Sequence, residues 1–191
     1  DEVTIMFTDF VGFTKIAERI GGVRLIAELD EIFSTFDRIS HDNGLERIKT
    51  IGDAYMAIAG LDGCEDHAQR TVNAAESMVA YLTERRQDNP SSPDWQIRVG
   101  AHSGPVVSGV IGGSRLAFDV WGDTVNVAAR MESSSEPGRI NISTATRDLL
   151  SRKTTQSRGR LAAKNKGDLT MFFVRPVDGG LPRTITETDH E

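Results

Sequence analysis

The sequence predicts an α+β fold in which helices pack on one mostly antiparallel sheet. Short β-rich segments alternate with two long segments whose apolar residues recur every three or four positions. The chain has 191 residues, of which 38% are hydrophobic and 26% are charged. A chain of this length buries about 70% of its unfolded surface, so it needs no disulfide or structural metal to fold.

The first half of the chain predicts a strand, a long helix and a hairpin. Residues 3–8 are apolar and β-rich, and a turn at residues 9–12 leads into helix. Residues 45–60 predict two strands of a hairpin whose tip is Gly52-Asp53. The long helix between them ends at Asn43-Gly44, and its apolar face carries Leu25, Ile26, Leu29, Ile32, Phe33, Phe36 and Ile39.

The second half of the chain continues the alternation of β-rich and helical segments. Residues 66–86 predict a second long helix, and the strand after it alternates in polarity from Trp95 to His102. A further strand is predicted at 106–111. The remaining predicted elements are a helix at 121–133, a short strand at 139–142, a short helix at 144–150, and closing strands at 154–165 and 169–175.

This order of elements indicates a ferredoxin-like βαββαβ core with a β-rich C-terminal extension. We expect one domain at residues 1–176. We expect residues 177–191, which are rich in Gly, Thr and acidic residues, to be a disordered tail.

Composition argues against several classes of protein. The net charge of −6 argues against a broad nucleic-acid surface, because such a surface needs a basic excess. The single cysteine, Cys64, excludes an intramolecular disulfide and a cysteine-cluster metal site.

No apolar run reaches the roughly 18–20 residues of a membrane span, so we expect no membrane contact within this chain. Because the first residues already read as a strand, we expect a domain cut from a longer polypeptide that carries its regulatory or sensor domain, and any membrane tether, elsewhere.

Two aspartates lie where predicted strands end. Asp9 follows the first strand, and Asp53 lies at the hairpin tip. If these strands are neighbours, the two carboxylates meet at one sheet edge, where they would bind a hard cation such as Mg²⁺ or Mn²⁺. Each residue also has a structural interpretation, since Asp9 could cap a helix and Asp53 could suit a tight turn.

Three further groups could hold the phosphates and sugar of a nucleotide. A helix start follows the first aspartate, and its backbone N–H groups can hold phosphate oxygens; it comprises Phe10, Val11, Gly12, Phe13 and Thr14. Asn126 and Arg130 are four residues apart, which puts an amide and a guanidinium on one helix face. Lys164 and Lys166 are adjacent cations. Each group also has a structural alternative. The helix start could be a plain turn, Asn126 and Arg130 could belong to an exposed polar face, and the two lysines could lie in a solvated turn.

Lys49 and Asp119 are a possible base-reading pair. A lysine only donates hydrogen bonds and an ionised aspartate only accepts them, which matches the amino donor and ring-nitrogen acceptor of adenine and mismatches guanine. The alternative is an ordinary exposed charge pair, which is worth little. Sequence spacing alone does not bring these two residues together.

Taken together, these residues closely resemble the catalytic domain of class III nucleotidyl cyclases, the adenylyl and guanylyl cyclase family. Four motifs match in the right order, at residues 7–14, 49–55, 102–104 and 118–131, with a looser match at 164–167. The resemblance runs from about residue 3 to residue 175. It implies the fold of that family and a cytoplasmic enzyme of intracellular signal transduction.

The resemblance assigns a role to each candidate residue. It implies that Asp9 and Asp53 bind two Mg²⁺ or Mn²⁺ ions per site, helped by the backbone carbonyl of Phe10. Lys49 and Asp119 fall on the base-selecting positions, and both are of the adenine type. The remaining roles are ribose positioning for Asn126, transition-state stabilisation for Arg130, and triphosphate binding for Lys164.

The implied activity is that of an adenylate cyclase, which converts ATP to 3′,5′-cyclic AMP and pyrophosphate. In this family the site forms between two domains. The metal aspartates come from one, and the base-selecting pair, Asn126, Arg130 and Lys164 come from the other. Because this chain holds both sets, the resemblance implies a head-to-tail homodimer.

Three features depart from the family pattern, and two alternatives stay open. Pro105 stands where some members place an arginine near the phosphates, and Asn165 stands where glycine is common. Phe10 replaces a frequent isoleucine, which should matter little for a ligand that acts through its backbone. A guanylyl cyclase is one alternative, against which Lys49 and Asp119 argue. The other is a non-catalytic cyclase-like domain, although such domains usually lack a metal aspartate or the Asn/Arg pair.

Overall fold

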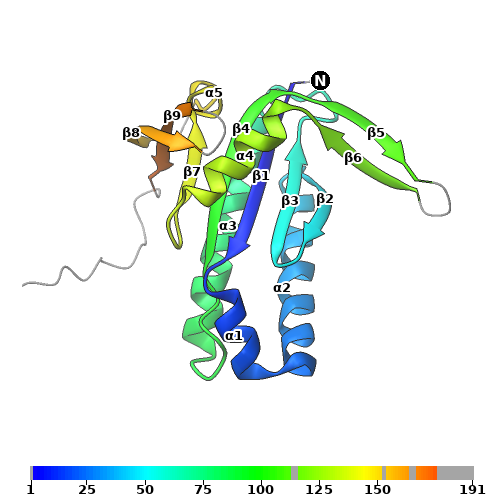
Figure 1. Ribbon diagram of the computed structural model, residues 1–191, viewed down its shortest axis with the longest axis vertical. Helices are drawn as coiled ribbons and strands as arrows, with labels where there is room; N and C mark the ends of the chain where they lie inside the picture. The colour runs from blue at the N-terminus through cyan, green and yellow to red at the C-terminus, as the bar shows by residue number, and fades with distance from the viewer. Residues whose placement is uncertain (1, 113–115, 152–153, 164–166, 176–191) are drawn as a thin grey trace, which may run out of the picture.

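The computed structural model describes residues 2–112, 116–151, 154–163 and 167–175 (Figure 1). The expected tail at 177–191 and the lysines at 164 and 166 lie outside these residues. A seven-stranded sheet runs in the order β2-β3-β1-β4-β7-β9-β8. Its strands are β1 (Glu2–Phe10), β2 (Glu46–Ile51), β3 (Ala54–Ala59), β4 (Ile97–Pro105), β7 (Ile140–Ser143), β8 (Thr155–Ala163) and β9 (Gly167–Val174).

The predicted fold class is confirmed. The order β2-β3-β1-β4 is that of a ferredoxin-like core, and these strands pair antiparallel. In the C-terminal extension β7 pairs parallel to β4, and β9 and β8 continue antiparallel. Several element boundaries differ from the prediction by a few residues, and one of them bears on the site: β1 extends through Phe10, so Asp9 lies within the end of the strand and not in the turn after it.

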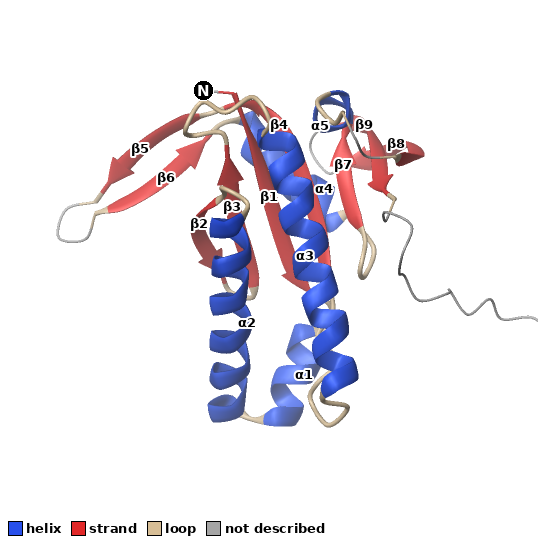
Figure 2. Ribbon diagram, turned by 180° about the vertical axis from the view of Figure 1, so that it is seen from behind, coloured by secondary structure: helices blue, strands red, loops and turns tan. Residues whose placement is uncertain are grey.

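Helices cover both faces of the sheet. Three helices, α1 (Phe13–Ile20), α2 (Gly22–Asp42) and α3 (His67–Asp88), lie on one face, which Figure 2 shows from the front. The opposite face carries α4 (Asp123–Ser133), seen in front of β4 and β1 in Figure 1. The short helix α5 (Thr144–Asp148) follows β7. Among the described residues, no helix is both long enough and apolar enough to cross a membrane.

The alternation of side chains along β1 decides which face each residue serves. Met6 and Phe10 pack in the core under α2 and α3, while Ile5 and Phe7 pack in the core under α4. Successive side chains point to opposite faces, so Asp9 lies on the same face as Phe7. The first candidate metal ligand therefore faces the side of the sheet that carries α4.

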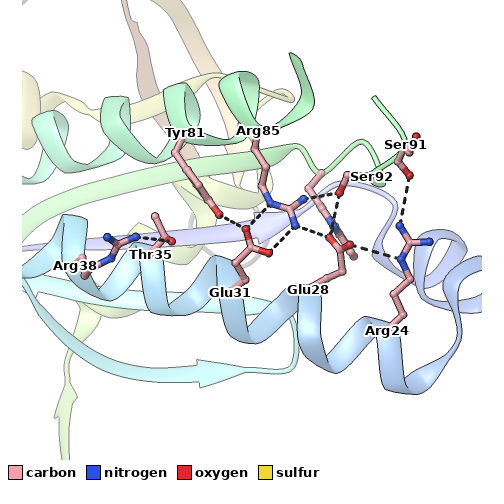
Figure 3. A network of polar contacts seen from close by, with 10 residues as sticks. Arg24, Glu28, Glu31, Thr35, Arg38, Tyr81, Arg85, Ser91 and Ser92 are labelled. Atoms are coloured by element: carbon pink, nitrogen blue, oxygen red, sulfur yellow. Dashed lines mark hydrogen bonds and ion pairs between the residues drawn. The ribbon is translucent and has the colours of Figure 1, made fainter. Parts of the chain in front are cut away.

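A network of ion pairs fastens α2 to α3 (Figure 3). The side chain of Arg85 on α3 donates to Glu28 at 2.8 Å and to Glu31 at 3.1 Å, both on α2. Glu28 also accepts from the indole Nε1 of Trp95 at 3.0 Å. Because Arg85 and Glu28 are mostly buried, with side chains only 13% and 11% exposed, each depends on the other to offset its loss of water.

A two-stranded ribbon extends away from the main sheet (Figure 1). It consists of β5 (Val107–Ile111) and β6 (Ala117–Trp121), which pair antiparallel. Large apolar side chains are exposed along it and at its end: Val107, Val110, Ile111, Leu116, Phe118 and Trp121. A row of exposed apolar side chains on a projecting ribbon is typical of a surface that is covered by a partner.

Gly100 allows α4 to lie directly on β4. A Cβ atom at Gly100 would lie 1.8 Å from the backbone nitrogen of Glu132 and 2.4 Å from its Cα. No side-chain rearrangement relieves such a clash, because the atoms it meets belong to the helix backbone. The helix that carries two candidate site residues is thus held at the closest approach that a strand permits.

We predict that Gly100→Ala lowers the free energy of unfolding by about 2–3 kcal/mol, the upper range for overpacking a core. Urea unfolding followed by circular dichroism measures it. Gly109→Ala is the matched control, because its Cβ would meet only the ring of Trp121 at 3.6 Å, an ordinary contact. Equal stability of the two variants would contradict the close packing of α4 on β4.

Candidate active site

The two aspartates meet at one edge of the sheet. Asp9 lies near the end of β1, and Asp53 lies in the turn between β2 and β3, the neighbour of β1. Gly52 permits this turn with its φ of 63° in the left-handed region. Burial, followed by the negative charge of Asp9, raises the pKa of Asp53 above its usual value. The proximity of Asp9 to the Asp53 turn thus comes from strand pairing.

Asp9 does not act as a helix cap. The N-cap residue of α1 is Gly12, with a φ of 67°, and α1 has no side-chain cap. The carboxylate of Asp9 instead pairs with the guanidinium of Arg98, its register partner on β4. The structural alternative for this residue is therefore excluded.

Sequence reasoning missed two charged residues of this site, Arg98 and Glu132. Besides its contact with Asp9, Arg98 donates through Nε to Glu132 at 3.1 Å. Burial, together with the charge of Asp9, raises the pKa of Glu132 to about 7, although Arg98 opposes this shift. A charged residue near the start of a mostly buried strand was the signal that could have found Arg98.

The donor set fits a hard cation only in part. Asp9 and Asp53 supply carboxylate oxygens, the ligands that Mg²⁺ and Mn²⁺ prefer. Among the described residues, no three His, Cys, Asp or Glu side chains converge as a metal cluster. This pair would therefore need the carbonyl of Phe10, phosphate oxygens and water to complete a coordination shell, as Mg²⁺ sites in phosphoryl chemistry commonly do.

The segment from Phe10 to Thr14 joins the aspartate edge to α1. The ring of Phe10 is 3% exposed and packs against Trp95 at 5.0 Å between centroids, which anchors the start of the segment. The amides of Lys15 and Ile16 donate to the carbonyl of Gly12. The amides of Phe13 and Thr14 have no backbone acceptor in the described part of the chain, so they are available to an anion.

Tertiary structure brings Lys49 and Asp119 together. Lys49 on β2 lies 2.5 Å from Asp119 on β6, measured from Nζ to Oδ2. This hydrogen bond from Lys49 lowers the pKa of Asp119 below its usual value. The second carboxylate oxygen of Asp119 accepts from the backbone N–H of Val120 at 2.9 Å. The lysine donor and the carboxylate acceptor thus lie side by side.

Asn126 and Arg130 lie on α4 as the spacing predicts. Asn126 is exposed and Arg130 is half-buried. Among the described residues, no hydrogen bond or ion pair links either side chain to Asp9 or Asp53. The start of the helix is held by Thr124, whose hydroxyl donates to the carbonyl of Pro105 at 2.6 Å. The proline that departs from the family pattern therefore anchors this helix, while Lys164 falls outside the described residues.

Comparison with known proteins identifies the family. The Adenylate and Guanylate cyclase catalytic domain family matches residues 1–176. The chain is 36% identical to guanylate cyclase 2G of Mus musculus over 185 residues, which cover 94% of this chain and 17% of that protein. It is also 36% identical to an adenylate cyclase of Mycobacterium tuberculosis over 176 residues, which cover 91% of this chain and 39% of that protein. The chain thus spans less than two fifths of the length of these relatives.

Solved structures agree with this family. The guanylate cyclase domain of RhGC from Catenaria anguillulae, in complex with GTP, superposes with a TM-score of 0.86 at 33% identity, covering 92% of this chain and 96% of that one. The non-canonical dimeric guanylyl cyclase domain of the RhoGC fusion protein from Blastocladiella emersonii superposes with a TM-score of 0.82 at 32% identity, covering 91% of this chain and 96% of that one. The chain belongs to the adenylate and guanylate cyclase catalytic domain family, the class III nucleotidyl cyclases.

We predict that Lys49→Met raises the pKa of Asp119 toward its ordinary value, because the substitution removes the group that stabilises the ionised carboxylate. Carboxyl-carbon NMR titration measures this. Arg47→Met is the matched control, since Arg47 on the same strand pairs with Asp37 at 3.0 Å. If both variants leave Asp119 unchanged, the ion pair does not persist in solution.

Proposed function

We propose that this domain is an adenylate cyclase that converts ATP to 3′,5′-cyclic AMP and pyrophosphate in intracellular signalling. The observation that carries the proposal is the pairing of Lys49 with Asp119 at 2.5 Å. A lysine donor next to a carboxylate acceptor complements the ring nitrogen and amino group of adenine. Guanine presents the opposite pattern, and buried polar groups left unpaired by a wrong base reject it strongly.

In the proposed reaction each group has a separate task. The 3′-hydroxyl of the ribose attacks the α-phosphorus in line, and pyrophosphate leaves. Two divalent ions held by Asp9, Asp53 and the carbonyl of Phe10 would lower the pKa of that hydroxyl and neutralise the phosphates. Asn126 orients the ribose, and Arg130 meets the charge that develops on the phosphoryl oxygens. The free amides of Phe13 and Thr14 receive phosphate oxygens, with Lys164 as a further phosphate contact.

We infer that the active unit is a head-to-tail homodimer. One chain would supply Asp9 and Asp53, and its partner would supply Lys49, Asp119, Asn126, Arg130 and Lys164. The exposed apolar side chains of the β5–β6 ribbon support a partner on this part of the molecule. The two-fold symmetry of such a dimer gives two equivalent sites.

The second candidate is a guanylate cyclase. The observation in its favour is the similarity to guanylate cyclase 2G and to the GTP-bound domain of RhGC, both of which carry that activity in their names. The two candidates share the metal edge and differ in the residues that read the base. The chemistry of positions 49 and 119 complements adenine, and this supports the first candidate.

We predict that the wild-type domain turns over ATP with a kcat/KM at least about tenfold above that for GTP, because guanine presents the opposite pattern of donor and acceptor to the one that Lys49 and Asp119 complement. Chromatography of the products with Mg²⁺ or Mn²⁺ measures both rates. The double substitution Lys49→Glu and Asp119→Ala is expected to reverse the preference. GTP preference in the wild type would replace the adenylate assignment with the guanylate one, and no product at any protein concentration would support a non-catalytic domain.

We predict that Arg130→Ala lowers turnover by at least about a hundredfold, the scale of losing one donor to a developing oxyanion. Asp53→Asn is expected to be similarly inactive through loss of a metal carboxylate. An equimolar mixture of the two inactive variants should recover about a quarter of wild-type activity, because half of the dimers are mixed and each holds one intact site. No recovery after subunit exchange would argue against sites shared between two chains.

A further inference from the structure

Arg98 lies between two acidic groups of different kinds. On one side its guanidinium pairs with Asp9, the proposed metal ligand at the end of β1. On the other side its Nε donates to Glu132 at 3.1 Å. Arg98 is 33% exposed and Glu132 only 13%, measured on their side chains. The guanidinium of Arg98 is therefore shared between two carboxylates. Asp9 is the one that would bind metal, and Glu132 is the less exposed one.

The helix end that carries Glu132 is packed closely on β4, whereas the Arg98 side chain has a long, flexible stem. The backbone of Glu132 lies against Gly100, where a Cβ would come within 1.8 Å of its nitrogen. The end of α4 therefore has no freedom to move toward β4. Arg98 has a long side chain with a flexible stem, and its two acidic partners are reached through different nitrogens, Nη2 for Asp9 and Nε for Glu132. It can release one partner while it keeps the other.

The charges of the metal ion and of Arg98 explain why Arg98 needs Glu132 as a second acidic partner. A divalent ion on Asp9 and Asp53 would repel the guanidinium of Arg98 and compete with it for the same carboxylate, which favours release of Asp9 by Arg98 when the ion arrives. Without Glu132, the displaced guanidinium would be left partly buried with no acidic partner, which is costly. With Glu132 in place, it keeps a charge-assisted hydrogen bond.

Glu132 itself does not fit the role of a metal ligand. It does not converge with Asp9 and Asp53 as a cluster of metal-binding side chains in the described residues. Its nearest charged contact is Arg98, which lies between it and Asp9. Its influence on a cation would act through the position of Arg98.

We propose that Arg98 holds Asp9 before metal binds and then shifts its hydrogen bonding wholly to Glu132, which makes Arg98 and Glu132 positioning residues for the metal site. This inference rests on the proposed metal role of Asp9. Glu132 keeps Arg98 from competing with the metal. Before metal binds, Arg98 balances the negative charge of Asp9.

Binding of Mn²⁺ to the full chain without nucleotide tests this, with free Mn²⁺ measured by electron paramagnetic resonance at about pH 8, above the raised pKa of Glu132. We expect Glu132→Gln to weaken Mn²⁺ binding by at least about tenfold, because Asp9 becomes the only acidic partner of Arg98. We expect Arg98→Gln to bind Mn²⁺ at least as tightly as wild type, because the competing cation is gone. The double variant should regain most of the affinity that Glu132→Gln loses.

The control is Glu136→Gln, which removes an equal charge from a residue that instead pairs with Arg158 at 3.6 Å. It should leave Mn²⁺ affinity near wild type. If Arg98→Gln does not fold, as thermal unfolding would show, the comparison of Glu132→Gln with Glu136→Gln decides. A merely structural role predicts that all Arg98 and Glu132 variants weaken Mn²⁺ binding together, and that result would overturn the inference.

Asp9→Asn separates this inference from the proposed function. Loss of Mn²⁺ binding in that variant upholds the metal role of Asp9, and the Arg98 and Glu132 variants then test the inference alone. If Asp9→Asn binds Mn²⁺ like wild type, the proposed metal site is wrong and the inference is overturned with it.

Discussion

The pairing of β1 between β3 and β4 is the constraint on which the candidate site depends. Its antiparallel register with β4 places Asp9 opposite Arg98, and its register with β3 places Thr8 opposite Tyr55, next to the turn that carries Asp53. Val3, Ile5 and Met6 of this strand are fully buried, so a slip by one residue would turn apolar side chains to the wrong face. Burial of β1 therefore fixes where the carboxylates meet.

The candidate site concentrates negative charge around one guanidinium, that of Arg98. Asp9, Asp53 and Glu132 lie around a single guanidinium, and burial or mutual repulsion raises the pKa of Asp53 and of Glu132. Such an arrangement is unfavourable when left uncompensated, and perturbed carboxylates of this kind gather at functional sites. Arg98 supplies part of the compensation within the chain, and the proposed divalent ions would supply the rest.

The remaining candidate residues belong to a second group on the same chain. Lys49 and Asp119 form one pair, because β2 and β6 bring Nζ of Lys49 to 2.5 Å from Oδ2 of Asp119. Asn126 and Arg130 lie on α4 and, in the described residues, do not contact Asp9 or Asp53. α4 is held to β4 at Gly100 and to Pro105 through Thr124. The position of one group is thus rigidly coupled to that of the other through β4, which gives each chain a fixed geometry to offer to a partner.

The sequence by itself determined the elements and the ferredoxin-like core, because apolar periodicity and glycine turns are local signals. It also pointed to Asp9, Asp53, Asn126 and Arg130, whose neighbourhoods carry the family motifs. Only the tertiary structure decided that Lys49 meets Asp119, 70 residues away, and that Arg98 bridges Asp9 and Glu132. Ion pairs between distant segments depend on strand order and register, which local patterns do not encode. The ion pairs of Arg98 with Asp9 and Glu132 were missed for that reason, since the partners lie on distant segments of the chain.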